Sequence, residues 1–154
     1  MSLEVGSPAP EFTLPCSTGS DVSLASLRGH KVVLWFYPKD NTPGCTTEAC
    51  AFRDLQTEFG SLGAVTYGVS RDSIRSHGNF ITKHSLGLPL LSDPELEAQN
   101  AFGVWVEKRN YGRTYMGTER STFLIDEVGV VRRVWRKVRV KGHVDEVLAA
   151  VREL

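Results

Sequence analysis

The sequence predicts an α/β fold in which helices flank a central mixed β-sheet. Apolar runs of strand length alternate with segments of helical periodicity along much of the chain. A hairpin signal, Glu127–Val128–Gly129, joins two late strands. Alternating strands and helices favour parallel strand pairing, whereas a hairpin pairs its strands antiparallel. Both kinds of pairing are therefore expected in one sheet.

The first third of the chain is expected to form short extended segments and then a buried strand. The opening GSPAPEF is too rich in turn formers for a helix. FTLP and DVSLASL, separated by CSTGS, are predicted to pair as a short hairpin. Residues 31–37 are an unbroken apolar run after Lys31, which is typical of a central strand. The next helix should begin after Thr42 and end near Phe59, where Gly60 can stop it.

The rest of the chain continues the alternation. Strands are expected at residues 64–70 and 88–91, as an outward and a return strand within 104–116, and as the late hairpin of 121–126 and 130–135. Helices are expected at 73–84, from Asp93–Pro94 to Gly103, and at 143–154.

Length and composition are those of an ordinary globular protein. The 154 residues fit one domain, residues 1–154, with 41% hydrophobic and 23% charged residues. Lys plus Arg equals Asp plus Glu at 18 each, so bulk charge indicates neither nucleic acid nor a membrane as partner. The N-terminus is not signal-like and no long apolar run is present, which favours a cytoplasmic protein. Three cysteines favour redox chemistry or buried thiols over a secreted disulfide scaffold.

The stretch PKDNTPGCTTEAC, from Pro38 to Cys50, is the candidate functional site. Thr42 can cap the helix and Pro43 suits its first position, which places Cys45 in the first turn. The helix N-terminus favours thiolate over thiol, but an exposed dipole contributes only about 0.3–1 kcal/mol. Lowering a thiol pKa from about 8.5 to below 7 takes roughly 2 kcal/mol. A reactive Cys45 therefore predicts a cationic partner from elsewhere in the chain.

The two cysteines of this stretch are predicted to point in different directions. Cys45 begins an apolar stripe that continues through Ala49, Phe52, Leu55 and Phe59, so it should face the core edge. Cys50 lies five residues on, rotated by about 140°, with its Cα roughly 8–9 Å from that of Cys45. A disulfide needs less than about 7 Å. The helix must unwind if the two cysteines are to bond.

Pro38, Thr42 and Cys45 match the pattern Pro, three residues, Thr or Ser, two residues, Cys, and the stretch resembles the active site of the peroxiredoxins. A second cysteine five positions on is similar to the bacterioferritin comigratory protein (PrxQ) branch. The resemblance extends to GSPAPEFTLP, YGRTYMGTERSTFLID and VKGHVDEVL. It implies a thioredoxin-like fold with an N-terminal hairpin extension.

The resemblance also implies a role for each residue of the site. Cys45 would attack the terminal oxygen of a hydroperoxide and become a sulfenic acid. Thr42 would orient the sulfur and the peroxide, although its residue type alone indicates only a helix cap. Pro38, which could merely end the strand, would shield the thiolate from water. Arg120 precedes the core strand STFLID and is the candidate cation.

Further implications concern turnover and partners. Cys50 would resolve the sulfenic acid by forming the Cys45–Cys50 disulfide, although it could be only a small residue on a half-exposed helix face. Thioredoxin or a similar dithiol protein would reduce that disulfide, with no metal, haem or flavin cofactor, in a protein that is a monomer. Cys16 is expected to be incidental.

Several other features have plainer interpretations. Glu48 and Arg53 are interpreted as helix-surface charges, and the four histidines as surface or loop residues without zinc spacing. The basic stretch VRRVWRKVRVKGH could bind nucleic acid, but alternation favours a solvated strand face, and it could also dock an acidic reductant.

Two alternatives to a peroxidase remain open. A general thiol–disulfide oxidoreductase would usually carry C-x-x-C, which is absent here. A redox-sensing or chaperone-like protein would use the Cys45–Cys50 pair as a switch.

Overall fold

The apolar run that starts at Lys31 forms the middle strand of a five-stranded sheet in the computed structural model, which describes residues 3–154. The strands of this sheet are β3 (Lys31–Phe36), β4 (Ala64–Ser70), β5 (Leu90–Ser92), β8 (Ser121–Ile125) and β9 (Val131–Trp135). Their order is β5-β4-β3-β8-β9. Pairing is parallel among β3, β4 and β5 and antiparallel among β3, β8 and β9, so the predicted mixed sheet is confirmed.

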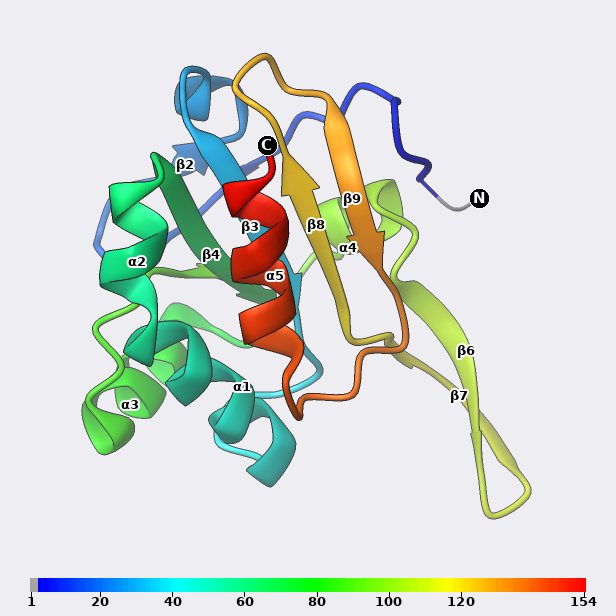
Figure 1. The fold of residues 1–154 in the computed structure, drawn as a ribbon. Coiled ribbons are helices and arrows are strands. Elements are labelled where there is room, and N and C mark those ends of the chain that lie inside the picture. The colour runs from blue at the N-terminus through cyan, green and yellow to red at the C-terminus, as the bar shows by residue number, and fades with distance from the viewer. Residues whose placement is uncertain (1–2) are drawn as a thin grey trace.

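Helices cover both faces of the sheet (Figure 1). One face carries α1 (Pro43–Asp54), α2 (Gln56–Ser61), α3 (Ile74–His84) and α5 (His143–Arg152), and the other carries α4 (Glu97–Ala101). The second face is also covered by the N-terminal segment, in which β1 (Thr13–Leu14) pairs with β2 (Val22–Ser23) ahead of a 3-10 turn, η1 (Ala25–Leu27). The predicted N-terminal hairpin is therefore confirmed.

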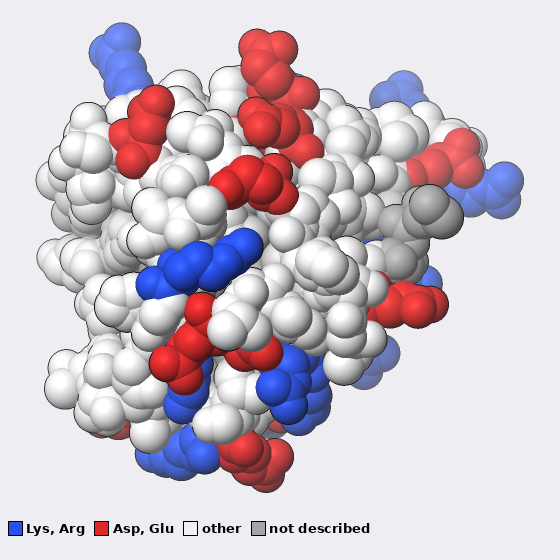
Figure 2. Space-filling view, turned by 90° about the horizontal axis from the view of Figure 1, so that it is seen from above, with Lys and Arg blue, Asp and Glu red and all other residues white. Residues whose placement is uncertain are grey.

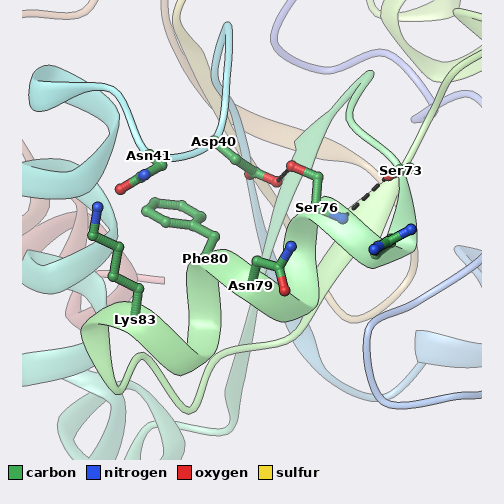
Figure 3. Close-up of a pocket in the computed structure, with 8 residues that line it drawn as sticks. Asp40, Asn41, Ser73, Ser76, Asn79, Phe80 and Lys83 are labelled. Carbon is green, nitrogen blue, oxygen red and sulfur yellow. Dashed lines mark hydrogen bonds between the residues drawn. The ribbon is translucent and has the colours of Figure 1, made fainter.

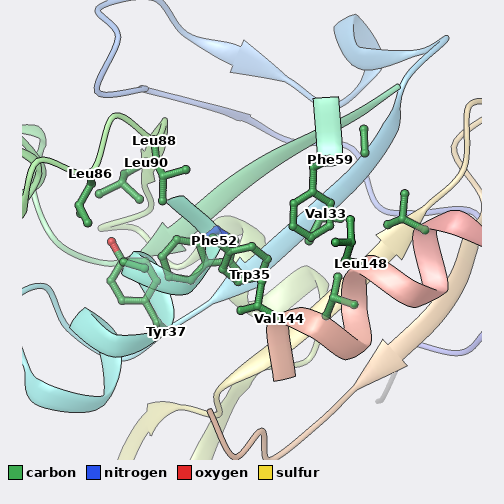
Figure 4. Close-up of a cluster of buried hydrophobic side chains, with 14 of the residues drawn as sticks. Val33, Trp35, Tyr37, Phe52, Phe59, Leu86, Leu88, Leu90, Val144 and Leu148 are labelled. Atoms are coloured by element: carbon green, nitrogen blue, oxygen red, sulfur yellow. The ribbon is translucent and has the colours of Figure 1, made fainter. Parts of the chain in front are cut away.

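Alternation along β3 divides the core into two layers. Val33, Trp35 and Tyr37 face α1, α2, α3 and α5, whereas the residues between them face α4 and the N-terminal hairpin. Figure 4 shows the first layer, in which Trp35 stacks on Tyr37 at 4.7 Å and on Phe52 of α1 at 5.0 Å between ring centroids. The helix that carries both candidate cysteines is thus fixed to the middle of the sheet.

The predicted single helix up to Phe59 is wrong in one respect. The chain leaves helical geometry at Leu55, where φ is −105° and ψ is 8°, and a separate helix α2 follows. The break lets α1 and α2 take different directions, so that α2 packs along β4. Phe59 stays buried in the same layer as Phe52. No glycine or proline marks this break, so tertiary packing decides it.

Two further boundaries differ from the prediction. The strand predicted at 88–91 is β5 (Leu90–Ser92), and α4 begins at Glu97 rather than directly after Pro94. Asp93 explains the second difference, because its carboxylate accepts the backbone N–H of Gln99 at 2.9 Å and so caps the helix from a preceding turn.

The outward and return strands predicted within 104–116 form a two-stranded arm that projects from the body of the molecule (Figure 1). They are β6 (Trp105–Asn110) and β7 (Arg113–Thr118), joined by the turn Tyr111–Gly112, and they pair only with each other within residues 3–154. Tyr111 at the tip is 98% exposed, whereas Thr118 at the base is buried. The base of the arm leads directly to Arg120.

The surface carries charges of both signs. Figure 2 shows Lys and Arg side chains interspersed with Asp and Glu on one face of the molecule, in keeping with the balanced composition. Among the helices within residues 3–154, none has the length and apolar character needed to cross a membrane.

Gly68 of β4 provides a test of the packing around Trp35. A Cβ at Gly68 would lie 2.6 Å from the Trp35 ring and 2.7 Å from Leu90, so Gly68→Ala should destabilise the protein by about 1–3 kcal/mol. The matched control is Gly78→Ala in α3, where a Cβ meets nothing within 4 Å. It should stabilise the protein by up to about 1 kcal/mol. Urea unfolding measures both changes, and equal stability of the two variants would contradict this packing.

Candidate active site

Cys45 lies in the first turn of α1, as the sequence predicts, and its side chain is almost fully buried at 1% exposure. Pro43 occupies the first helical position, and the backbone N–H of Thr46 donates to the Thr42 carbonyl at 2.8 Å. The thiol therefore sits at the positive end of a helix, against the core layer of Trp35.

The predicted cationic partner of Cys45 is Arg120. Its Nη2 lies 3.2 Å from the Cys45 sulfur, and its Nη1 donates to Oε1 of Glu48 at 2.6 Å. Arg120 directly precedes β8, so strand pairing with β3 brings it beneath the start of α1. The planar guanidinium can serve two partners at once, because its N–H groups point in fixed directions.

Gly44 makes room for this arrangement. A Cβ at residue 44 would lie 3.3 Å from Nη2 of Arg120, which is the atom that contacts Cys45. Burial acts to lower the pKa of Arg120, but the adjacent Glu48 and Cys45 raise it above its usual value. Arg120 is therefore a permanent cation in a site where only 17% of its side chain is exposed.

Glu48 corrects the prediction from the sequence. It was predicted to be a surface charge, but its side chain is fully buried and paired with Arg120. Burial raises the pKa of Glu48 to about 7, with Arg120 acting in the opposite direction. The available signal was its position three residues after Cys45, because residues i and i+3 share a helix face. That face was already predicted to meet the core.

Thr42 and Pro38 lie on the loop between β3 and α1. The predicted side-chain cap by Thr42 is wrong, since its hydroxyl donates to the carbonyl of Lys39 at 2.8 Å instead. The hydroxyl is thereby turned back toward the loop, which it closes into a turn. Pro38 lines an open cavity of about 440 Å³ together with Trp105 and Met116 of the β6–β7 arm.

Cys50 lies half-buried on the same helix as Cys45, and both cysteines are free thiols. Cys16, predicted to be incidental, is also buried but packs in the core layer on the other face of the sheet, with Leu91 as its bridge partner. The sheet therefore separates Cys16 from Cys45 and Cys50, which belong with the first layer.

Two of the four histidines are not at the surface, which corrects the prediction. His77 is fully buried, with Nδ1 2.7 Å from Asp40 and Nε2 2.9 Å from the Leu91 carbonyl. His143 is also buried, and its Nε2 lies 2.8 Å from the Thr122 hydroxyl. Both were misassigned because isolated histidines give no periodic signal. Across residues 3–154, no group of three or more His, Cys, Asp or Glu side chains is placed to hold a metal ion.

The basic stretch from Val131 to His143 is partly neutralised within the protein. Arg136 pairs with Glu119 at 3.0 Å and Arg132 with Asp126 at 3.4 Å. Arg133 lies over the ring of Trp135 at 4.8 Å. Half of the six cations of the stretch therefore have partners, so it presents less free charge than its sequence indicates.

Glu48 gives the site a predicted effect on stability. The folded protein holds this proton up to about pH 7, whereas an ordinary glutamate has a pKa of 4.5. The folded state thus binds more protons than the unfolded chain between these values, so the unfolding free energy should fall as pH rises through them, by no more than a few kcal/mol. The Glu48→Gln variant has no carboxyl group at this position, so its unfolding free energy should change less over this pH range. Urea unfolding of the parent and the variant at about pH 5 and about pH 7.5 measures the change in unfolding free energy of each. An equal change in both proteins would argue against the effect of Glu48.

Comparison with known proteins shows the family of the chain. Residues 5–134 match the AhpC/TSA family. The chain is 51% identical over 148 residues to the putative peroxiredoxin Bcp of Coxiella burnetii, covering 96% of this chain and 98% of that protein. It is 50% identical over 154 residues to peroxiredoxin Bcp of Bacillus subtilis, covering 100% and 98%.

The fold agrees as well. The solved structure of the bacterioferritin comigratory protein of Xanthomonas campestris matches with a TM-score of 0.88 at 47% identity, covering 92% of this chain and 90% of that one. The predicted thioredoxin-like fold is therefore confirmed. The chain belongs to the AhpC/TSA family and, within it, to the peroxiredoxins known as Bcp or PrxQ.

Proposed function

We propose that the protein is a thiol peroxidase in which the Cys45 thiolate reduces hydrogen peroxide and organic hydroperoxides. The sulfur attacks the terminal peroxide oxygen and the O–O bond breaks. Cys45 becomes a sulfenic acid, and the other oxygen leaves as water or alcohol after taking a proton from solvent. The contact between Arg120 and Cys45 at 3.2 Å is the observation that carries the proposal. The solved Xanthomonas campestris protein, described in terms of alkyl peroxide reduction activity, supports it.

Arg120 supplies the main electrostatic contribution in this proposal. It holds the thiolate in the ground state, and it can stabilise the charge that develops on the peroxide oxygens as the O–O bond breaks. Thr42 positions the sulfur and peroxide from the loop side, and Pro38 limits the access of water. The open cavity beside Pro38 is lined by Trp105 and Met116 but not by Cys45 or Arg120, and we assign it as the approach of an organic hydroperoxide to the site.

Cys50 completes the cycle. Its thiolate attacks the sulfenic sulfur of Cys45, water leaves, and the Cys45–Cys50 disulfide forms. Both cysteines lie on one helix, so this bond requires the first turns of α1 to unwind. The protein would thus alternate between a folded form that reacts with peroxide and an unwound form that carries the disulfide.

Thioredoxin or a similar dithiol protein would then reduce the disulfide and restore both thiols. A yeast mitochondrial 1-Cys peroxiredoxin of 25% identity is described as having its thiol resolved through glutathione and thioredoxin systems, which supports a dithiol reductant of this class. The proposed setting is antioxidant defence in the cytoplasm, by a monomer that needs no cofactor.

The alternative is a redox-sensing or chaperone-like switch, in which the disulfide changes binding rather than completing a catalytic cycle. Steady-state consumption of peroxide with reduced thioredoxin would support the peroxidase. Stoichiometric oxidation that stops after one turnover would support the switch.

Cys50→Ser tests the resolving role. The variant should be oxidised at Cys45 as fast as the parent, because Cys50 makes no contact with the Arg120 guanidinium. Recycling by thioredoxin should be lost, since no disulfide can form. Mass spectrometry after one equivalent of peroxide distinguishes a sulfenic acid from a disulfide. Cys16→Ser is the control and should recycle normally. Native turnover of the Cys50 variant would refute the assignment.

Arg120→Met should lower the rate of Cys45 oxidation by roughly 10²-fold or more, because a preorganised donor to the reacting atoms is lost. Arg109→Met on the exposed face of β6 is the control and should react at the parent rate. Loss of Arg120 also leaves buried Glu48 without its partner, so the double variant with Glu48→Gln separates folding from catalysis. Oxidation at the parent rate in a folded double variant would contradict the role of Arg120.

A further inference from the structure

Helix α3 contacts the chain on both sides of the two reactive cysteines. Upstream, its residues Ser76 and His77 contact Asp40, five residues before Cys45, and Nε2 of His84 lies 2.8 Å from Oδ1 of Asn41. Downstream, the carbonyl of His84 accepts a hydrogen bond from Arg53, three residues after Cys50, at 2.9 Å. The segment that must unwind in the proposed cycle therefore lies between two attachments to one helix.

The upstream contact at Asp40 is buried and has several partners. Ser76 donates its hydroxyl to Oδ2 of Asp40 at 2.8 Å (Figure 3). Tyr37 donates to Oδ1 of Asp40 at 2.6 Å. Nδ1 of His77 lies 2.7 Å from Oδ2, in a pair whose side chains are 0% and 3% exposed. Nε2 of His77 must carry a proton, because its partner, the Leu91 carbonyl, can only accept. His77 is thus held at both nitrogens.

The backbone of Asp40 is fixed as well. Its N–H donates to Oδ2 of Asp72 at 2.8 Å, and the Ser70 hydroxyl at the end of β4 donates to the same oxygen at 2.7 Å. Moving Asp40 would leave several buried polar groups without partners, which is far more costly than losing a solvated contact. The chain immediately before Thr42 is therefore fixed to the sheet and to α3.

The downstream contact is weaker. The Arg53 side chain is 34% exposed, and besides the single bond to the His84 carbonyl it pairs with the more exposed Asp54 at 2.9 Å. Solvent can replace the bond to His84 when α1 moves. Arg53 lies one helical turn beyond Cys50, so this bond holds the part of α1 that must move if Cys50 is to reach Cys45.

We propose that α3 is a clamp with one fixed and one releasable contact, an inference that rests on the proposed resolution of Cys45 by Cys50. The Asp40–His77 contact keeps the loop that carries Pro38 and Thr42 in place for the first oxidation. The Arg53–His84 contact delays unwinding and so sets the rate at which the disulfide forms. These are positioning residues, and the two contacts affect different steps of the cycle.

The upstream contact is tested by Asp40→Asn and by the milder Ser76→Ala, which removes one donor to Asp40. Both should slow the oxidation of Cys45 by about 10-fold or more, since small misplacements of reacting groups have effects of this size. Disulfide formation from the sulfenic acid should keep the parent rate. Asn79→Ala is the control, because Asn79 lines the same pocket and its side chain makes no hydrogen bond within residues 3–154. Parent-like oxidation in the folded Ser76 and Asp40 variants would overturn this half of the proposal.

The downstream contact is tested by Arg53→Met, which keeps the apolar part of the side chain. Cys45 oxidation should be unchanged, and disulfide formation should be about 2- to 10-fold faster, the range that corresponds to one hydrogen bond. Less Cys45 should also be over-oxidised to sulfinic acid at high peroxide. Asp54→Asn is the control, because it leaves the Arg53–His84 bond in place. Disulfide formation in Arg53→Met at a rate equal to or below that of the parent would overturn this half of the proposal.

The charge of Arg53 lies near Cys50 and could itself assist the Cys50 thiolate. The parent and the Arg53→Met variant are therefore compared at neutral pH and at about pH 9.5, where an ordinary thiol is ionised without help. Disulfide formation must be faster in Arg53→Met than in the parent at the higher pH as well. Acid quenching and mass spectrometry follow sulfenic acid and disulfide separately. Absence of any Cys45–Cys50 disulfide in the parent would refute the proposed function. Parent-like oxidation of Cys45 in the Asp40 and Ser76 variants, together with parent-like disulfide formation in Arg53→Met, would refute only the clamp.

Discussion

The structure depends most on one guanidinium group shared between two acidic side chains. Arg120 contacts the sulfur of Cys45 with one nitrogen and the carboxylate of Glu48 with another, and all three groups are largely or fully buried. Two adjacent anions with a single cation would carry a net negative charge in a site of low dielectric, which is unfavourable. Burial raises the pKa of Glu48, and a protonated Glu48 leaves the charge of Arg120 available to the sulfur.

The fold explains how Arg120 and two residues of α1, from two distant parts of the sequence, reach this arrangement. Pairing of β8 with β3 brings residue 120 alongside the end of the strand that leads into α1. Stacking of Phe52 on Trp35 fixes α1 over the sheet, so Cys45 and Glu48 point down toward Arg120. The absence of a side chain at Gly44 then lets the guanidinium approach the sulfur. Sheet, helix packing and loop each fix one side of the site.

The sequence was informative where a periodic pattern or a motif marks the structure. The apolar run of β3, the late hairpin and the position of Cys45 in the first turn of a helix were all predicted. A cationic partner for Cys45 was predicted because the helix dipole alone is too weak to ionise a thiol, and that partner is Arg120. The family motif then selected it among the arginines. The break at Leu55 was missed, since it arises from packing of α2 along β4 and has no local signal.

The residues that escaped prediction are buried polar groups. Glu48 and His77 were assigned to the surface because charged and polar side chains are usually exposed. Each is buried against a partner from a distant part of the sequence: Arg120 pairs with Oε1 of Glu48, and Asp40 pairs with His77. Such pairs depend on tertiary contacts, which a single sequence does not display.

Burial also differs between the two cysteines, and this difference orders the proposed cycle. Cys45 is sealed against Arg120 and the core, where a sulfenic acid would be reached by small peroxides but protected from larger reductants. Cys50 is only half-buried, and within residues 3–154 no guanidinium donates a hydrogen bond to its sulfur as Arg120 does to Cys45. Peroxide should therefore react first with Cys45, because thiolate character and positioned donors govern that step. The same helix that favours this first reaction prevents the second, so any route to the disulfide must loosen α1 without disturbing the loop that precedes it. The structure provides such a route. The buried contacts of Asp40 hold the loop before α1, whereas the half-exposed Arg53 holds the end of α1 beyond Cys50.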